Sequence, residues 1–210
     1  MDWQEVAGRE RARYEEAGKA VLRGNAAYGA GLAALMAGDG DGAREWLVRA
    51  AARWRESWAD ATPTSWGRPI GVVKALLLAG DDAGAEEAAA WALGLGCEQA
   101  ESPIGRYAAA LALLALGRDA EAGRAAGSIR GRDDFPGAVA DALACVAAHD
   151  AAGYAEAAEA VLESFESRDA YLEDVPVADT VLVLQALAAR RGVPTGLAPS
   201  ALLPPDPVSP

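Results

Sequence analysis

Four short windows of the chain share one pattern, in which an apolar helical run stops at a small corner and a second helical run begins. A glycine ends the first run in three windows, and His149 takes its place in the fourth. An aspartate follows within two residues each time. The windows are AGDGDGAREW from Ala37, AGDDAGAEEA from Ala79, LGRDAEAGRA from Leu116 and AHDAAGYAEA from Ala148. The pattern restricts the chain to pairs of helices joined by tight corners.

Each corner combines a residue that ends one helix with a residue that starts the next. Glycine adopts the left-handed conformation without steric cost and commonly closes a helix. Aspartate accepts hydrogen bonds from the free N–H groups of the next helix and favours the positive end of its dipole. The corners lie at Gly38, Gly80, Gly117 and His149, at spacings of 42, 37 and 32 residues. Spacings of this size are typical of helical-hairpin repeats, so we predict a stack of antiparallel helix pairs.

The connections between the hairpins also repeat, because each places a proline just ahead of a helical run. Proline is tolerated in the first turn of a helix, where its missing N–H costs little. No alternating apolar run bounded by turns predicts a strand, so we expect an all-α fold. The predicted helices cover residues 2–22, 26–37, 42–59, 67–79, 83–95, 103–116, 119–130, 136–148, 152–167 and 176–191. We expect one helical-repeat domain over residues 1–203 and a Pro-rich extended tail over 204–210.

Residues 20–192 resemble tetratricopeptide-like helical repeats, most closely in AAYGAGLAALMAGDGDGAREWLVRAAARW. Small residues stand there at Gly31, Ala34 and Ala43, where the two helices cross, and at Ala50, where the second helix must come close. The resemblance implies a right-handed superhelical stack of about ten antiparallel helices, an α-solenoid. It also implies a concave face that binds a peptide or protein segment, and no chemistry.

The last third of the chain resembles the carboxyl-terminal half of immunity protein 49, a family of polymorphic-toxin immunity proteins. The matching features are the turn at Asp150, a helix that ends in carboxylates and arginine, the segment LAARRGVP and a closing Leu-Pro. They lie in FPGAVADALACVAAHDAAGYAEAAEAVLESFESRD and VPVADTVLVLQALAARRGVPTGLAPSALLP. The resemblance implies an antidote that binds and blocks a toxin.

Composition excludes several classes of partner. The net charge is −12, so phosphate contacts with nucleic acid are disfavoured, and so is an anionic membrane surface. A basic partner is favoured instead. The amino-terminal segment is charged and does not resemble a signal peptide, and Cys97 and Cys145 stand alone, so we expect a cytoplasmic protein. Only two lysines accompany 17 arginines, which fits either a GC-rich genome or adaptation to high salt.

The residues of catalysis and metal binding are sparse. His149 is the only histidine, and no phosphate-binding or zinc-binding motif occurs, so we expect neither an enzyme nor a metal or other cofactor. Carboxylates cluster at Glu163, Glu166, Asp169, Glu173, Asp174 and Asp179. Asp174 and Asp179 fit the start of the last predicted helix, where negative charge is favourable, and Glu163, Glu166 and Asp169 are predicted partner-binding residues. We interpret them as a solvated acidic rim or as a docking surface for a basic partner.

Tryptophans and arginines form a second candidate site. Trp46, Trp54 and Trp58 share one face of a predicted helix, which is typical of a core but also of an interface anchor. Arginine in the first turns of a helix opposes the helix dipole. We expect such arginines to pair with a carboxylate of a neighbouring hairpin or to grip an acidic partner group. The predicted partner-binding residues here are Trp54, Trp58, Trp66, Arg68, Arg106 and Tyr107.

Three hypotheses about function follow. The first is a non-catalytic helical-repeat protein that binds another protein or peptide through a concave groove. The second is an immunity-type antidote that binds and neutralises a toxin domain. The third is a small-ligand binder or enzyme that uses the tryptophan and arginine cluster.

Overall fold

The computed structural model describes residues 1–194 and 196–205, and over them the chain is all-α, as predicted. The described residues form ten α-helices and three short 3₁₀ turns, with no strand. The α-helices are α1 (Trp3–Glu16), α2 (Ala20–Met36), α3 (Gly40–Glu56), α4 (Gly67–Leu78), α5 (Asp82–Gly94), α6 (Pro103–Ala115), α7 (Asp119–Gly127), α8 (Gly137–Ala147), α9 (Ala151–Glu166) and α10 (Asp179–Ala189). The 3₁₀ turns are η1 (Ser57–Asp60), η2 (Cys97–Gln99) and η3 (Leu172–Asp174). None of the described helices is both long and apolar enough to cross a membrane.

The four predicted corners are confirmed. Gly38, Gly80 and Gly117 have φ angles of 74°, 64° and 69°, and His149 adopts the same left-handed conformation at 55°. Aspartate caps the following helix at three of the corners, where Asp39, Asp81 and Asp150 accept a hydrogen bond from the backbone N–H three residues later.

The third corner differs from the prediction. Arg118 occupies the cap position of α7 and makes no side-chain cap bond, while Asp119 lies in the first helical turn. The extra residue between Gly117 and Asp119 places the carboxylate too late to cap α7, and it makes other contacts described below.

Two helix boundaries near the amino terminus were predicted wrongly. The chain breaks at residues 17–19 rather than 23–25, so Gly24 and Asn25 lie inside α2. Gly24 is a point of close approach rather than a helix break, because a Cβ there would lie only 2.6 Å from Cδ1 of Trp54. The eight later helices match the predicted ranges within three residues at each end.

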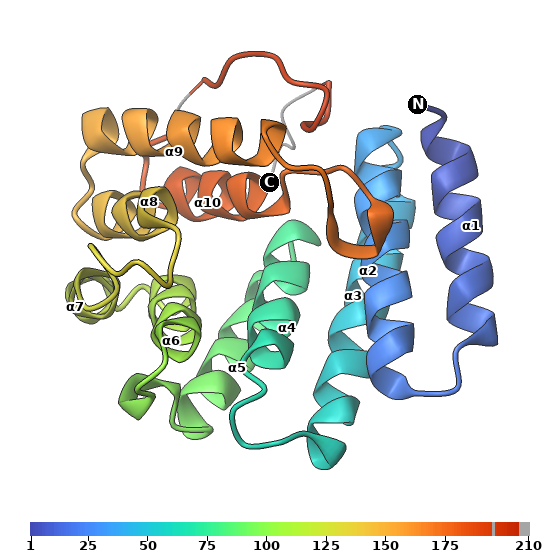
Figure 1. Ribbon diagram of the computed structural model, residues 1–210, viewed down its shortest axis with the longest axis horizontal. Helices are drawn as coiled ribbons and strands as arrows, with labels where there is room; N and C mark the ends of the chain where they lie inside the picture. The colour runs from blue at the N-terminus through green and yellow to red at the C-terminus, as the bar shows by residue number, and fades with distance from the viewer. Residues whose placement is uncertain (195, 206–210) are drawn as a thin grey trace.

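Successive helices pack against one another along the chain and form a stack (Figure 1). Alternate helices also touch, since α4 contacts α6 and α6 contacts α8. The backbones approach closely where side chains are small. A Cβ at Gly31 of α2 would lie 2.7 Å from Cγ of Leu47 in α3. The predicted role of Gly31 at a helix crossing therefore agrees with the structure.

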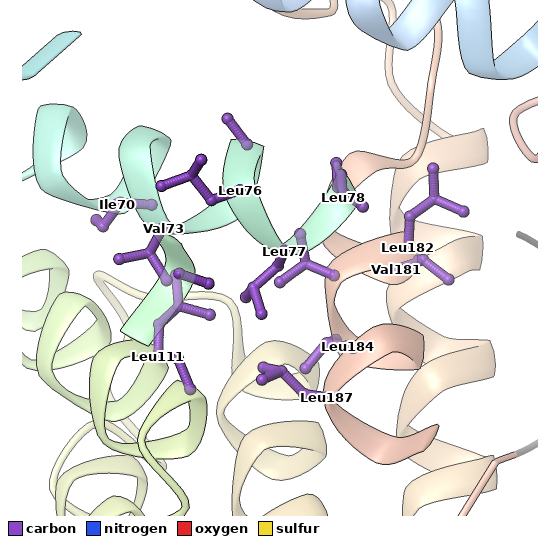
Figure 2. Close-up of a cluster of buried hydrophobic side chains, with 14 of the residues drawn as sticks. Ile70, Val73, Leu76, Leu77, Leu78, Leu111, Val181, Leu182, Leu184 and Leu187 are labelled. Atoms are coloured by element: carbon purple, nitrogen blue, oxygen red, sulfur yellow. The ribbon is translucent and has the colours of Figure 1, made fainter. Parts of the chain in front are cut away.

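The last helix leaves the sequential order and closes the stack. Helix α10 packs against α4, α8 and α9, and η3 reaches α2. Figure 2 shows Leu184 and Leu187 of α10 directed toward Leu77 of α4, and Leu111 of α6 beside Val73 of α4. The labelled residues, all buried, are Ile70, Val73, Leu76, Leu77, Leu78, Leu111, Val181, Leu182, Leu184 and Leu187. A helix that is apolar on most sides is expected to be enclosed by protein, as α10 is.

After α10, the described residues 190–194 and 196–205 contain no helix. Residues 196–205 return to the stack, because the backbone N–H of Ala178 donates to the carbonyl of Leu202 over 2.9 Å. Leu202 and Leu203 are partly buried against the core. The predicted extended tail covers residues 204–210. Of these, residues 206–210 lie outside the part of the chain that the structure describes.

Candidate functional site

Trp54, the first predicted anchor, lies in the core. Its side chain is 5% exposed and fits between two glycines, Gly24 of α2 and Gly71 of α4. The indole Nε1 donates to Oδ1 of Asn25 over 2.9 Å, and the ring lies 5.0 Å from that of Tyr28. A partner cannot reach this side chain without moving the surrounding helices.

The structure brings Trp58 and Trp66 together and adds a third tryptophan that the sequence pattern did not indicate. The ring of Trp58 lies 6.2 Å from Trp66 and 6.0 Å, edge to face, from Trp91 of α5. Trp66 is buried against Gly105 of α6, whereas Trp58 and Trp91 are partly exposed. The three tryptophans connect three successive hairpins, so they contribute mainly to packing between helices.

Within the described chain, the two arginines bind backbone carbonyls and not the carboxylate of a neighbouring hairpin that was one of the two predicted partners. Arg68 donates to the carbonyl of Ser57, and Arg106 donates to the carbonyl of Glu98. Neither makes an ion pair within the part of the chain that the structure describes. Each guanidinium thus caps the carboxyl-terminal end of the preceding helical segment, where positive charge is favourable. Tyr107, beside Arg106, is buried and lies 5.5 Å from the ring of Phe135.

One carboxylate of the predicted acidic cluster, Asp179, is not on a solvated rim but lies in an ionic cluster with Lys74 and Tyr28, two partners that sequence analysis missed. Nζ of Lys74 in α4 lies 2.5 Å from Oδ2 of Asp179 and 3.1 Å from Oγ1 of Thr180, both in α10. The hydroxyl of Tyr28 in α2 donates to the same Asp179 oxygen over 2.8 Å. These contacts link α10 to two helices more than 100 residues earlier in the chain.

The pKa values in this cluster favour an ion pair over proton transfer at neutral pH. Burial acts to lower the pKa of Lys74, but the Asp179 carboxylate outweighs it and the net pKa is raised. Burial acts to raise the pKa of Asp179, but Lys74 and the hydroxyl of Tyr28 bring it below its usual value. The pKa of Tyr28 is raised well above its usual value, first by burial and then by Asp179. The cluster therefore acts as a clamp at the start of α10.

A second clamp holds the end of α10. The buried guanidinium of Arg191 donates to Asp119 and, over 2.6 Å, to the carbonyl of Leu114. Nε2 of His149 lies 2.8 Å from the other oxygen of Asp119. Burial acts to raise the pKa of Asp119, but Arg191 and His149 bring it below its usual value. Asp119 thus joins the third and fourth corners of the stack to α10.

A third contact attaches η3 to the amino-terminal hairpin. Glu173 accepts hydrogen bonds from Arg13 of α1 and, over 2.9 Å, from the side-chain amide of Asn25 in α2. Glu173 and Asp174 both have left-handed backbone conformations, with φ of 55° and 56°. Such conformations cost about 1–3 kcal/mol each in residues other than glycine and are maintained by surrounding contacts.

Glu163, Glu166 and Asp169, the carboxylates predicted to bind a partner, lie on the surface. Glu163 of α9 and Asp169 of the following loop are exposed, and Glu166 accepts a hydrogen bond from Oγ of Ser200 over 2.7 Å. Glu156 is also exposed, while Glu159 accepts from the backbone N–H of Ala198. No glutamate of α9 makes an ion pair with any residue that the structure describes. We refer to the four glutamates Glu156, Glu159, Glu163 and Glu166 as the α9 acidic face.

The arginines of α3 provide a contrast, because three of the four already have an acidic partner within the chain. Arg49 pairs with Glu45, Arg53 with Glu56, and Arg55 with Glu87. The positive charge of this helix is largely neutralised internally, whereas the negative charge of the α9 acidic face is not.

Comparison of the chain with protein-family models, with curated proteins and with solved structures gives no match. Over residues 1–194 and 196–205 the structure holds no group of three or more side chains placed to bind a metal ion.

Proposed function

We propose that this protein is a non-catalytic, tetratricopeptide-like repeat protein that binds a basic protein partner in the cytoplasm. The observation that supports the proposal is the uncompensated charge of the α9 acidic face. Residues 150–179 contain nine carboxylates and a single arginine, Arg168, and only Glu173 and Asp179 among these carboxylates pair with a cation elsewhere in the described chain. Complementary charge steers association and favours the correct partner over others.

The inner face of the stack is a weaker candidate for the contact. Helix α10 packs there against α4 and α8, and it buries Val181, Leu184 and Leu187 almost completely. Burying an aliphatic side chain of this size contributes about 1.5–3 kcal/mol, so displacing α10 would cost several times that amount. We therefore place the proposed contact on the outer surface, at the α9 acidic face.

The proposal is tested by capturing the partner from a lysate of the native host, with identification by mass spectrometry. The bait is compared with a variant carrying Glu156→Gln and Glu163→Gln. A matched control carries Glu5→Gln and Asp60→Asn, two other exposed carboxylates without an ion pair in the described chain. We expect the wild type and the control to capture a basic protein that the α9 variant loses, with weaker capture at high salt. Equal capture by all three baits would contradict the proposal.

A second candidate is the immunity-type antidote, in which the basic partner is a toxin domain. It is favoured because the resemblance to immunity protein 49 covers residues 135–169 and 175–204, and this part of the chain carries the α9 acidic face. Co-expression with a toxin encoded beside its gene is expected to restore growth, and the α9 variant is expected to fail. The candidate is removed if no toxin gene lies nearby or if the wild type gives no protection.

A further inference from the structure

A shallow hollow of about 230 Å³ lies where the corner between α1 and α2 meets η3. Figure 1 shows the orange loop that contains η3 extending from α9 to α2. The residues that line it are Arg13, Glu16, Ala17, Leu22, Ala26 and Glu173.

The aliphatic part of the wall is formed by Ala17, Leu22 and Ala26. Leu22 is 50% exposed, Ala17 is partly exposed and Ala26 is buried beneath them. Leu172, the residue before Glu173, is 52% exposed. The nearby cation of Arg23 is already engaged, because it donates to the carbonyl of Ala17 over 2.8 Å.

The free charge in the hollow is negative. Arg13 is the only cation among the lining residues, and it pairs with both Glu10 and Glu173. Glu173 is further satisfied by Asn25. Glu16 is exposed and makes no ion pair with any described residue. The hollow thus combines aliphatic walls with one carboxylate that has no internal partner.

We propose that this hollow receives a lysine or arginine side chain of the basic partner, and this inference rests on the proposed function. Both side chains have an aliphatic stem that packs on apolar surface and a cationic head that stays at its edge. The stem would cover Leu22, and the head would pair with Glu16. A purely apolar side chain fits less well, because it would desolvate the Glu16 carboxylate without pairing it.

The hollow and the α9 acidic face are linked through Glu173, which lines the hollow and lies seven residues after the end of α9. The loop that leaves α9 carries the exposed carboxylates Asp169 and Asp174 before and after Leu172. A partner that lies along α9 would therefore follow acidic residues to the hollow. The hollow would fix the position of one basic side chain, while the α9 acidic face would supply attraction that depends less on position.

The experiment uses the intact protein with isotope-labelled leucine methyl groups. N-acetyl-arginine methylamide is added stepwise, and the methyl signals are followed by NMR. The neutral citrulline analogue has nearly the same shape and serves as the matched probe. We expect saturable shifts of the Leu22 and Leu172 methyl signals with the arginine probe. Binding is expected to be about tenfold weaker for citrulline and for the Glu16→Gln variant, because charge-assisted hydrogen bonds are the stronger ones.

The control separates this inference from the proposed function. Glu163→Gln changes the α9 acidic face but leaves the hollow intact, so it is expected to bind the arginine probe like the wild type. Equal binding of the arginine and citrulline probes, or no saturable shift at Leu22, would overturn the inference while leaving the capture experiment unaffected. Circular dichroism melting curves check that Glu16→Gln, at an exposed position, folds normally.

Discussion

The fit of Trp54 between two helices gives a sharp test of whether this side chain is core or a free anchor. A Cβ at Gly71 of α4 would lie 2.7 Å from Cε3 and Cζ3 of Trp54, well inside normal contact distance. Gly71→Ala should therefore cost about 1–3 kcal/mol of overpacking. The same substitution gains about 1 kcal/mol of helix propensity, which partly offsets the cost. The net expectation is a loss of up to about 2 kcal/mol.

Gly8→Ala is the matched control, because Gly8 lies within α1 and no side-chain or neighbouring atom comes within 4 Å of its added Cβ. It should show the propensity gain alone, a stabilisation of about 1 kcal/mol. The free energies of unfolding are measured by urea denaturation with tryptophan fluorescence, at unchanged m-value. The difference between the two variants isolates the steric cost, expected at about 1–3 kcal/mol. Equal stabilisation by both substitutions would refute the reasoning and show that the Trp54 ring is free to move away.

Three further predictions concern the clamps and the corners. Lys74→Met should reduce the free energy of unfolding by about 3–5 kcal/mol, because it leaves a largely buried carboxylate at Asp179 unpaired; a loss below 1 kcal/mol in urea would speak against the clamp. Because the pKa of Asp119 is lowered in the folded state, its contribution is present above its unfolded pKa of about 3.9 and is lost as pH falls through the folded value. Asp119→Asn should thus be less stable than the wild type at pH 7, and the gap in urea midpoint should narrow toward acid; a constant gap would contradict this. Gly80→Ala should cost about 1–2 kcal/mol from the left-handed backbone alone, since no atom lies within 4 Å of the added Cβ, and an unchanged melting temperature would exclude that strain.

Local chemistry was enough to predict the corners but not the closure of the stack. Gly38 and Gly80 end helices because of their own backbone freedom, and the aspartates that follow act on amides three residues away. The predicted break at residues 23–25 is wrong, and the need for glycine at position 24 comes from Trp54, about 30 residues later.

The candidate site was likewise predictable only where local sequence determines the structure. The exposure of Glu163 follows from its place on the polar side of an amphipathic helix, which the sequence displays. Lys74 and Asp179 pair although they are more than 100 positions apart. The sequence around either residue contains no local pattern that indicates its partner. Arg68 and Arg106 are unusual in the sequence because they lie in the first turns of helices. Their partners were not predictable, because they are backbone carbonyls, which every residue carries.

The position of α10 affects how this chain can be made and how it can evolve. In an open array each hairpin depends only on its neighbours, so units can be added or lost singly. Here residues 179–191 contact helices that begin near residues 20, 67 and 103, so the amino-terminal hairpins lack these contacts until residue 191 has been synthesised. Such long-range closure slows folding. Insertion of one extra hairpin between α4 and α8 would pull the two ends of α10 away from their partners.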